Sequence, residues 1–350
     1  MTAILILKTG ALGDVLRTTS ILPGLHRCYP DARVEWVTAP AAADLVQHHP
    51  LVASTRTLRP DDEEGARALG AELGSDWTRV ISLDDERPLC ALASAVGSTD
   101  TISGAYLDGE GERRYTADVG PWFDMGLLSV HGKERADAMK VANTRSHAAI
   151  YADMLGIEMG EPELPLTAAG DASRADFVAR LEAVGKRRWI GLNTGSGGRW
   201  ESKKLSVERT LELARKLDAE CPSELGFVTL GGPDERDRNA RIVEGLSGLA
   251  YVDAGVDNSL LAFAGIVDTL DLLVTSDSLA LHVAVARRVP VLSFFAPTSA
   301  AEIELYGRGA KVLSTAPDYC SYQKDADTST LTVDRLVPPA LEQLAQSSRT

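Results

Sequence analysis

Short apolar segments alternate with amphipathic ones along the whole chain. Residues 4–7 form a continuous apolar run, which is typical of a strand buried on both faces of a sheet. In the following segment, up to residue 29, apolar residues recur at intervals of three and four positions, and this spacing predicts a helix. The alternation continues to the end of the chain and predicts parallel sheets with helices on both faces.

The same reading assigns elements to both halves of the chain. In the first half, strands are expected at 4–7, 33–38 and 79–83, helices at about 14–29, 41–48, 61–73, 88–96 and 144–155, and a loop or small hairpin at 104–118. In the second half, strands are expected at 189–193, 226–230, 271–275 and 289–295, and helices at 171–184, 206–219, from 234 onward, 279–288 and 333–344.

A segment without periodicity separates the two halves. Residues 156–170 contain two prolines and three glycines, a composition typical of a linker between domains. At 350 residues, the chain is long enough for two domains that each bury a core. We therefore expect two similar α/β domains, residues 1–165 and 166–350.

Composition and charge exclude several classes of protein. The 36 basic and 50 acidic residues give a net charge of −14, which opposes general nucleic-acid binding and adsorption to an anionic membrane. The chain has neither a transmembrane-length apolar run nor a signal-peptide pattern, so we expect a cytoplasmic protein. Its four cysteines are scattered without a Cys-x-x-Cys pair, which favours free thiols over a zinc site or disulfides.

The loop between the first predicted strand and helix carries the first candidate chemistry. It reads Lys-Thr-Gly-Ala-Leu-Gly-Asp over residues 8–14, and such strand ends line the binding crevice of an open α/β sheet. A carboxylate here, Asp14, can serve as a general base. Asp14 can equally be a helix cap, and Gly10 and Gly13 can be present for turn geometry alone, so both interpretations stay open.

Polar turns also follow the predicted strands of the second half. The turn that includes Thr194, Gly195 and Ser196 offers hydroxyls and backbone N–H groups that suit phosphate oxygens. Lys203 follows closely and can neutralise a diphosphate. The turn lacks the Walker pattern, and a simple solvated turn explains the same residues.

A second turn, at residues 276–282, combines Asp277 with His282 at the start of a predicted helix. The helix N-terminus can bind a phosphate while the histidine adds a donor. The alternative is a capping aspartate and a histidine packed in the core.

Taken together and in order, these segments resemble glycosyltransferase family 9, the heptosyltransferase family that builds the inner core of lipopolysaccharide. The resemblance rests on residues 13–16 with Thr18, 30–32, 191–196 with Lys203, 230–235, 276–284 and 295–298. It implies a GT-B fold, an α/β architecture in which two Rossmann-like domains with parallel sheets face each other across a cleft. It also implies an inverting transfer without a metal or other cofactor.

The resemblance further implies roles for individual residues. Asp14, in the acceptor-binding first domain, corresponds to the base, with Thr9, Gly10 and Gly13 in the acceptor loop. The second domain would bind the nucleotide-sugar, and the last helix would pack back on the first domain. The implied donor-binding residues are Thr194, Gly195, Ser196, Lys203, Asp234, Asp277, Ser278, Leu279 and His282. Leu279 stands where the family usually has a glycine.

The implied donor is a nucleotide-diphosphate sugar, above all ADP-heptose, and the acceptor supplies a hydroxyl. Lipopolysaccharide core, reached at the inner face of the membrane, is one acceptor. A soluble saccharide, metabolite or protein also fits, because the chain is acidic. Two other functions stay open: a nucleotide-sugar epimerase or hydrolase of the same architecture, and a catalytically silent sugar-nucleotide-binding protein.

Overall fold

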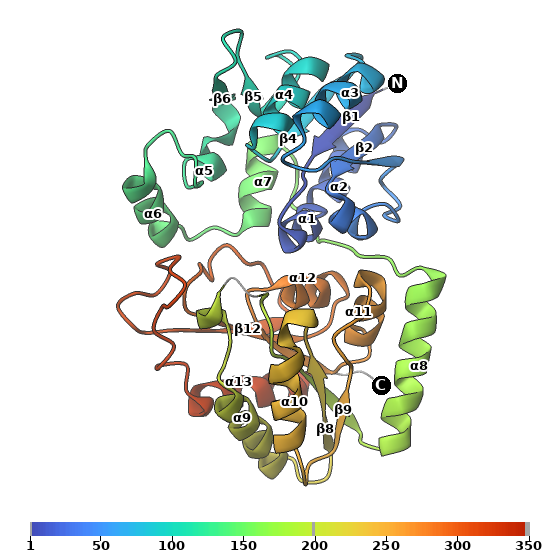
Figure 1. The fold of residues 1–350 in the computed structure, drawn as a ribbon, viewed down its shortest axis with the longest axis vertical. Helices are drawn as coiled ribbons and strands as arrows, with labels where there is room; N and C mark the ends of the chain where they lie inside the picture. Colours follow the sequence, from blue (N-terminus) through green and yellow to red (C-terminus); the bar gives the residue numbers. More distant parts are fainter. Residues whose placement is uncertain (1, 198–199, 347–350) are drawn as a thin grey trace. The chain divides into compact units, whose positions relative to one another are not determined.

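A computed structural model describes residues 2–197 and 200–346 of the chain (Figure 1). The chain forms two compact units, Met1–Pro165 and Leu166–Thr350. Each unit contains one six-stranded sheet with helices packed on it, so each is a Rossmann-like α/β unit.

The first unit is built on a sheet with the strand order β3-β2-β1-β4-β5-β6. Its strands are β1 (Ala3–Leu7), β2 (Arg33–Thr38), β3 (Ser54–Thr57), β4 (Arg79–Ser82), β5 (Ile102–Leu107) and β6 (Arg113–Tyr115). Strands β1 to β5 pair in parallel, whereas β6 pairs with β5 as an antiparallel hairpin. The paired residues of the hairpin, 105–107 and 113–115, lie within the segment 104–118 for which a loop or small hairpin was expected, whereas β5 itself begins earlier, at Ile102.

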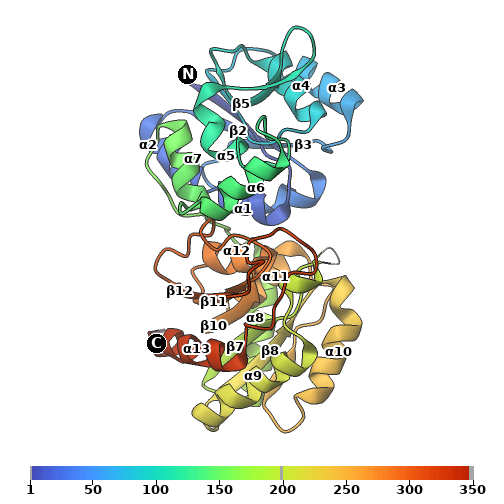
Figure 2. The ribbon, with the colours of Figure 1, turned by 90° about the vertical axis from the view of Figure 1, so that its left-hand side faces the viewer.

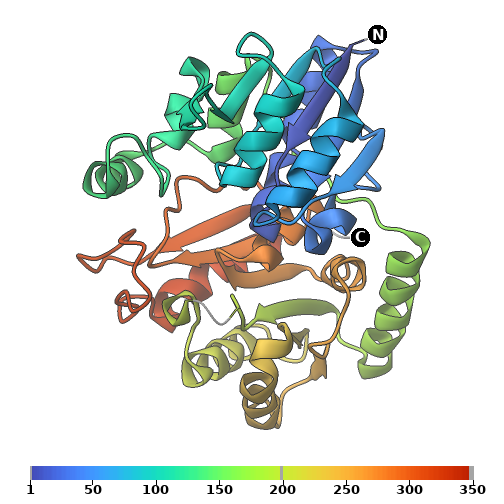
Figure 3. The same cartoon turned by 45° about the horizontal axis from the view of Figure 1, so that its top comes forward.

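Helices cover both faces of the first sheet. They are α1 (Leu12–Thr18), α2 (Ile21–Cys28), α3 (Glu63–Leu73), α4 (Arg87–Val96), α5 (Gly120–Phe123), α6 (Lys133–Ala142) and α7 (His147–Leu155), with short 3-10 turns at Pro40–Leu45 and Ala117–Val119. Leu5 and Leu7 pack in one core cluster with residues of α3 and α4, so Ile4 and Ile6 point to the opposite face. Figure 2 shows α2 and α7 on that side, and Figure 3 shows α3 and α4 along the strands.

The second unit repeats this plan with the strand order β12-β11-β10-β7-β8-β9. Its strands are β7 (Arg188–Asn193), β8 (Leu225–Leu230), β9 (Tyr251–Asp253), β10 (Leu272–Ser276), β11 (Val291–Phe295) and β12 (Gly309–Leu313). All the pairings recorded between these strands are parallel, as expected for strands joined by helical crossovers.

Two groups of helices pack on the second sheet. The helices are α8 (Ala168–Val184), α9 (Val207–Glu220), α10 (Arg236–Gly245), α11 (Leu260–Val267), α12 (Leu279–Ala286) and α13 (Val333–Gln346), with 3-10 turns at Glu201–Lys203 and Pro233–Glu235. One group consists of α8, α11 and α12, and the other of α10, α9 and α13, with α9 between its two neighbours (Figure 2).

The last helix shares the second unit's core. We expected it to pack back on the first domain. Within the second unit, its buried side chains Leu336, Ala340 and Leu344 join the cluster formed by the second sheet and α9. The helix has one apolar face, which packs against the strands β10, β11 and β12.

The structure also divides the first predicted helix in two. The segment expected to be one helix over residues 14–29 is α1 followed by α2. Pro23 explains the break, because proline has no N–H and its ring clashes with the carbonyl four residues earlier, that of Thr19. Proline is tolerated only in the first turn of a helix, and α2 accordingly begins at Ile21.

Gly104 provides a direct test of how closely β5 packs against β4. It has a φ of +135°, and a Cβ there would lie 1.8 Å from the Ser82 carbonyl oxygen. We expect Gly104→Ala to lower the free energy of unfolding by at least about 2 kcal/mol, through backbone strain and overpacking. Denaturant unfolding measures the loss. Gly109→Ala is the control, since a Cβ at Gly109 meets nothing within 4 Å, and equal losses in both variants would refute this explanation.

Candidate active site

The first unit has its topological switch point between β1 and β4. These strands are neighbours in the sheet, but the connections after them lead to opposite sides. Open α/β sheets bind their ligands at such points, outside the carboxyl ends of the strands. The loop of residues 8–14 follows β1, and the acidic residues 84–86 follow β4.

Asp14 is the third residue of α1 and combines two contacts. One carboxylate oxygen, Oδ2, accepts a hydrogen bond of 3.3 Å from the backbone N–H of Ala11. The other, Oδ1, lies 2.9 Å from Nη2 of Arg17. The side chain is still 37% exposed. Asp14 therefore stabilises the start of the helix and also presents a carboxylate at the switch point.

A buried ion pair joins the two strand ends beside Asp14. Lys8 Nζ contacts Asp84 Oδ1, and both side chains are almost fully buried. Burial disfavours the charged amine, but Asp84, Tyr151 and Asp14 together raise the pKa of Lys8 above its usual range. The carboxylate of Asp84 also accepts hydrogen bonds from the backbone N–H of Thr9 and, at 2.7 Å, from its hydroxyl. This network fixes the backbone just before the glycine-containing turn.

The acceptor-loop residues inferred from sequence have different surroundings. Both polar groups of Thr9 are bonded to Asp84, so Thr9 supports the loop. A Cβ at Gly10 would meet no described atom within 4 Å, and the φ angles of Gly10 and Gly13 are outside the left-handed region. Packing within the described chain therefore does not require a glycine at position 10.

The second unit has its switch point between β7 and β10, which are also adjacent. Asn193, the last residue of β7, connects the turns at this edge. Its side-chain Nδ2 lies 2.8 Å from the Gly195 carbonyl, 2.9 Å from the Thr275 hydroxyl and 3.1 Å from the Ser278 hydroxyl. The turn after β7 is thereby held against the start of α12.

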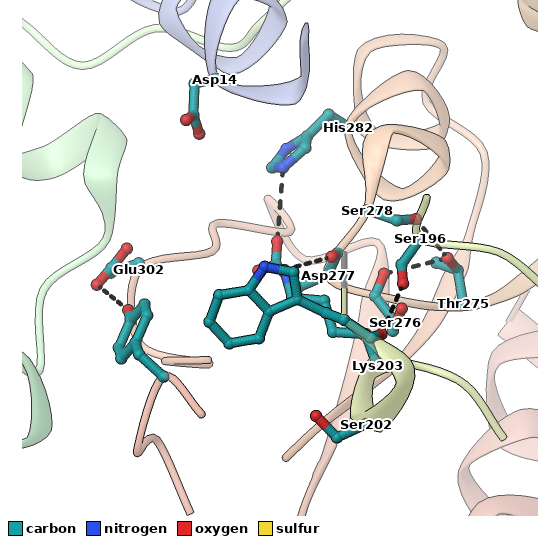
Figure 4. Close-up of polar contacts among 12 residues, drawn as sticks. Asp14, Ser196, Ser202, Lys203, Thr275, Ser276, Asp277, Ser278, His282 and Glu302 are labelled. Carbon is teal, nitrogen blue, oxygen red and sulfur yellow. Dashed lines mark hydrogen bonds and ion pairs between the residues drawn. The ribbon is translucent and has the colours of Figure 1, made fainter. Parts of the chain in front are cut away.

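Lys203, Asp277 and His282 lie together at the start of α12 (Figure 4). Lys203 Nζ lies 2.9 Å from both Oδ2 and the backbone carbonyl of Asp277, and His282 Nε2 lies 3.7 Å from Asp277 Oδ1. Burial favours the neutral form of Asp277, but Lys203 and His282 outweigh burial and hold the pKa of Asp277 well below its usual range. The structure thus brings together three of the residues inferred from sequence.

The start of α12 has an unusual cap. Ser278 is its N-cap residue, but its side chain makes no capping hydrogen bond within the described chain. The hydroxyl instead lies within hydrogen-bond distance of Asn193 and Thr275. Leu279, the first residue of the helix, is partly exposed. Because the Ser278 side chain does not cap them, the first N–H groups of α12 suit an anionic ligand.

The turn after β7 uses its polar residues partly for internal support. The Thr194 hydroxyl lies 3.0 Å from the Leu230 carbonyl and also contacts Asn239. A Cβ at Gly195 would lie 2.3 Å from the Glu235 side chain, so packing requires this glycine. The Ser196 hydroxyl donates to the Trp200 carbonyl at 3.2 Å, and its position in the turn is shown in Figure 4.

The acidic residues after β8 differ in burial. Asp234 is exposed on its 3-10 turn, whereas the next residue, Glu235, is buried. Glu235 accepts a hydrogen bond of 3.0 Å from the Gly232 N–H and lies 3.7 Å from Lys204 Nζ. Sequence reasoning selected Asp234 and missed Glu235. The available signal was a glutamate three residues after the N-cap residue Gly232, the position from which a side chain reaches back to the N-cap N–H.

Sequence reasoning also missed Lys8, Arg17, Asp84 and Asn193. Asp84 is 76 positions from Lys8, and only the adjacency of β1 and β4 brings the two together. Asn193 was visible as the polar end of a buried strand.

Among the described residues, no group of three or more His, Cys, Asp or Glu side chains could hold a metal ion. Nor is any helix in these parts of the chain long and apolar enough to cross a membrane.

Two Rossmann-like units, one with a carboxylate and the other with the start of α12 at its switch point, have the architecture of the GT-B fold, and the family match places the protein among the glycosyltransferases of this type. The chain belongs to glycosyltransferase family 9 (heptosyltransferase), whose family model matches residues 124–333. Membership in a transferase family sets it apart from the epimerases, hydrolases and silent binding proteins that the sequence left open.

Individual relatives agree with this assignment. Lipopolysaccharide heptosyltransferase 1 of Pseudomonas aeruginosa is 25% identical over 321 residues, which cover 87% of this chain and 81% of the relative. The family 9 glycosyltransferase of Veillonella parvula superposes with a TM-score of 0.77 at 17% identity, covering 99% of this chain and 98% of that chain. Heptosyltransferase WaaC of E. coli, solved with ADP-2-deoxy-2-fluoro heptose, gives a TM-score of 0.58 at 19% identity, covering 99% of both chains. The two structures show the fold.

Proposed function

We propose that this enzyme transfers heptose from ADP-heptose to an acceptor hydroxyl, with inversion at the anomeric carbon and without a metal ion. Asp14 acts as the general base in the first unit. The second unit binds the donor through Lys203, the start of α12 and the turn after β7. The donor is inferred from family membership and from the P. aeruginosa relative, whose name specifies heptose transfer.

The observation that carries the proposal is the position of Asp14. Its carboxylate is held by two contacts at the switch point of the first sheet and keeps more than a third of its surface exposed. A general base must be ionised, oriented and reachable by the hydroxyl whose proton it takes. The capping contact and the ion pair with Arg17 provide the orientation, and the exposed surface provides the access.

In the proposed step, the acceptor oxygen attacks the anomeric carbon as Asp14 removes the hydroxyl proton. The bond between that carbon and the diphosphate oxygen breaks, and ADP leaves with the electron pair. Lys203 and the N–H groups at the start of α12 stabilise the negative charge that develops on the diphosphate. Because the attack comes from the face opposite the leaving group, a single displacement inverts the configuration.

The role of Asp277 in this step is to hold Lys203. The ion pair and the contact with the Asp277 carbonyl fix the ammonium beside the start of α12. A lysine fixed in this way binds phosphate oxygens without first losing side-chain freedom. His282 places a second nitrogen donor near the same carboxylate.

For the acceptor, we propose a saccharide hydroxyl bound by the first unit, with lipopolysaccharide core as the first compound to test. The relative from P. aeruginosa is named for lipopolysaccharide. The acidity of this chain, at −14, also gives a reason to test soluble saccharides, because an acidic protein is repelled by an anionic lipid surface.

The experiment is a matrix of donors and acceptors. Purified enzyme is incubated with ADP-, GDP- and UDP-sugars against lipopolysaccharide core fragments and soluble saccharides, and nucleotide release and product are measured. We expect ADP-heptose to be used with an acceptor, in the presence of EDTA, and with inversion seen by NMR. Retention of configuration, loss of activity with EDTA or nucleotide release without any acceptor would each contradict a stated part of the proposal.

A further inference from the structure

We propose that Arg17 and Trp122 are positioning residues for Asp14: the Trp122 ring holds the Arg17 guanidinium, which in turn holds the carboxylate. The inference rests on the proposed function, in which Asp14 is the base. It assigns a task to two residues that sequence reasoning did not select.

Arg17 is an unusually enclosed partner for a helical ion pair. It follows Asp14 by three positions on α1, and its Nη2 lies 2.9 Å from Asp14 Oδ1. Exposed pairs with this spacing contribute little, since both side chains remain mobile and solvated. Here the arginine side chain is only 14% exposed, so it has little freedom to leave the carboxylate.

Trp122 provides a surface for the guanidinium. The Arg17 Cζ lies 5.4 Å from the centroid of the Trp122 ring, within the range of a cation–π interaction. Trp122 belongs to α5, whereas Arg17 and Asp14 belong to α1. The tertiary structure of the first unit, and not the local helix alone, therefore fixes the arginine.

The Trp122 ring packs against two aromatic side chains of α7. It meets His147 at 4.9 Å and Tyr151 at 5.4 Å, both in edge-to-face geometry with interplanar angles of 89° and 88°. His147 and Tyr151 are buried and contact each other, with ring centroids 3.8 Å apart. This aromatic cluster leaves the Trp122 ring few alternative orientations, and aromatic pairs of this kind add stability beyond burial.

Two contacts at different atoms then define the orientation of the base. Oδ1 of Asp14 meets Arg17, and Oδ2 meets the Ala11 N–H. With both oxygens held, rotation about the bond between Cβ and the carboxylate is restricted. A catalytic group held close to its reactive geometry loses less rate to misorientation.

The arginine also has an electrostatic effect on the base. A cation near a carboxylate favours its ionised form. Arg17 lies 2.9 Å from Asp14, and the other groups that interact with this carboxylate include the buried ammonium of Lys8 and the phenol of Tyr151. Removing the cation should therefore move the acidic limb of the pH–rate profile to higher pH. A residue that only stabilises the fold would leave this limb where it is.

The test compares Arg17→Met and Arg17→Lys with Trp122→Leu and Trp122→Phe. For Arg17→Met, we expect kcat to fall about 10- to 100-fold and the acidic limb to move upward, with donor affinity by calorimetry unchanged. Arg17→Lys keeps the charge but not the planar fork, so we expect a smaller loss of kcat and an unmoved limb. Trp122→Leu should lower kcat more than Trp122→Phe.

Arg27→Met is the matched control. Arg27 is a helical arginine of the same unit, whose exposed ion pair with Glu158 measures 2.7 Å, and its removal should change neither kcat nor the pH profile. Circular dichroism and thermal unfolding show whether each variant folds. If Arg17→Met does not fold, the milder variants Arg17→Lys and Trp122→Phe test the positioning role. A lower kcat in these folded variants supports the role, and a normal kcat in both contradicts it.

The outcomes separate this inference from the proposed function. An active Asp14→Asn enzyme overturns the proposed function, whatever Arg17 does. An inactive Asp14→Asn enzyme beside an Arg17→Met enzyme with normal kcat and an unmoved acidic limb overturns the positioning role alone. If the Trp122 variants raised the KM for the acceptor and left kcat unchanged, Trp122 would contact the acceptor. That result would overturn the proposal that Trp122 positions Arg17.

Discussion

Replacing Asp14 with asparagine is expected to lower the rate of sugar transfer by about 1,000-fold or more, because a general base typically contributes 100- to 10,000-fold. Asparagine has nearly the same shape, and its side-chain oxygen can still accept the Ala11 N–H that Asp14 binds at 3.3 Å. The capping contact is therefore retained and the proton acceptor is lost. Donor binding by calorimetry should not change, since the proposed donor-binding residues belong to the second unit.

The control for this variant is Asp62→Asn. Asp62 is the N-cap of α3 and accepts the Gly65 N–H at 2.7 Å, so it is a capping carboxylate of the same unit outside the site. Its replacement should leave the transfer rate unchanged. Single-turnover rates and melting temperatures of both variants separate catalysis from stability. If Asp14→Asn lost activity only in proportion to a lowered melting temperature, Asp14 would be a cap and not a base.

The second large effect is expected for Lys203→Met, which should weaken donor binding by about 100-fold or more. The substitution removes the cation beside the start of α12 and leaves the partly buried Asp277 without its main partner. Donor affinity falls because the ammonium no longer meets the diphosphate and because the unpaired carboxylate of Asp277 repels it; the loss of one member of the ion pair also lowers the stability of the fold. Calorimetric titration with ADP measures the change.

The loss of stability in Lys203→Met should depend on pH in a defined direction. Lys203 and His282 hold the pKa of Asp277 well below its usual range, against burial. A carboxyl with a lowered pKa in the folded state contributes stability above its unfolded pKa and loses it as the pH falls through the folded value. The difference between wild type and Lys203→Met should thus be largest at neutral pH and shrink in acid.

The control here is Lys216→Met, on α9. Lys216 forms exposed ion pairs with Glu212 and Asp334 at 3.1 and 2.7 Å, and exposed pairs contribute little. We expect unchanged affinity for ADP in this variant. If Lys203→Met bound ADP as tightly as the wild type, the proposed contact between Lys203 and the diphosphate would be wrong.

The sequence predicted the buried strands best. The central strands β1, β2, β4, β7, β8, β10 and β11 are mostly buried on both faces, as β10 shows throughout, and their apolar residues predicted them; β5 was covered only by the loop or hairpin expected at 104–118. The edge strands β3, β9 and β12 were missed because they are short and partly exposed. Helix α11 was missed because its residues are almost uniformly apolar and show no helical period, and α6 because it buries few side chains.

The site was predictable where the chemistry is local in sequence. Asp277 and His282 lie five positions apart, at the point where a buried strand gives way to a helix, and the contact between them needs only the first turn of that helix. The pairing of Lys8 with Asp84 depends on strand order, and the contact between Arg17 and Trp122 depends on the packing of α5. Neither the strand order nor this packing has a local signal in the sequence.

The contacts described above for Asn193, Lys203 and Asp277 all lie within the second unit. Each partner of these three side chains named above belongs to residues 166–346. Because the proposed donor-binding residues all lie in the second unit, we expect nucleotide choice to follow that unit. A chimera joined at Pro165, with the first unit of a family member that uses a different acceptor, should keep the donor preference of this enzyme. Acceptor range and donor range can thus be altered separately, by recombination in nature or by exchange in the laboratory.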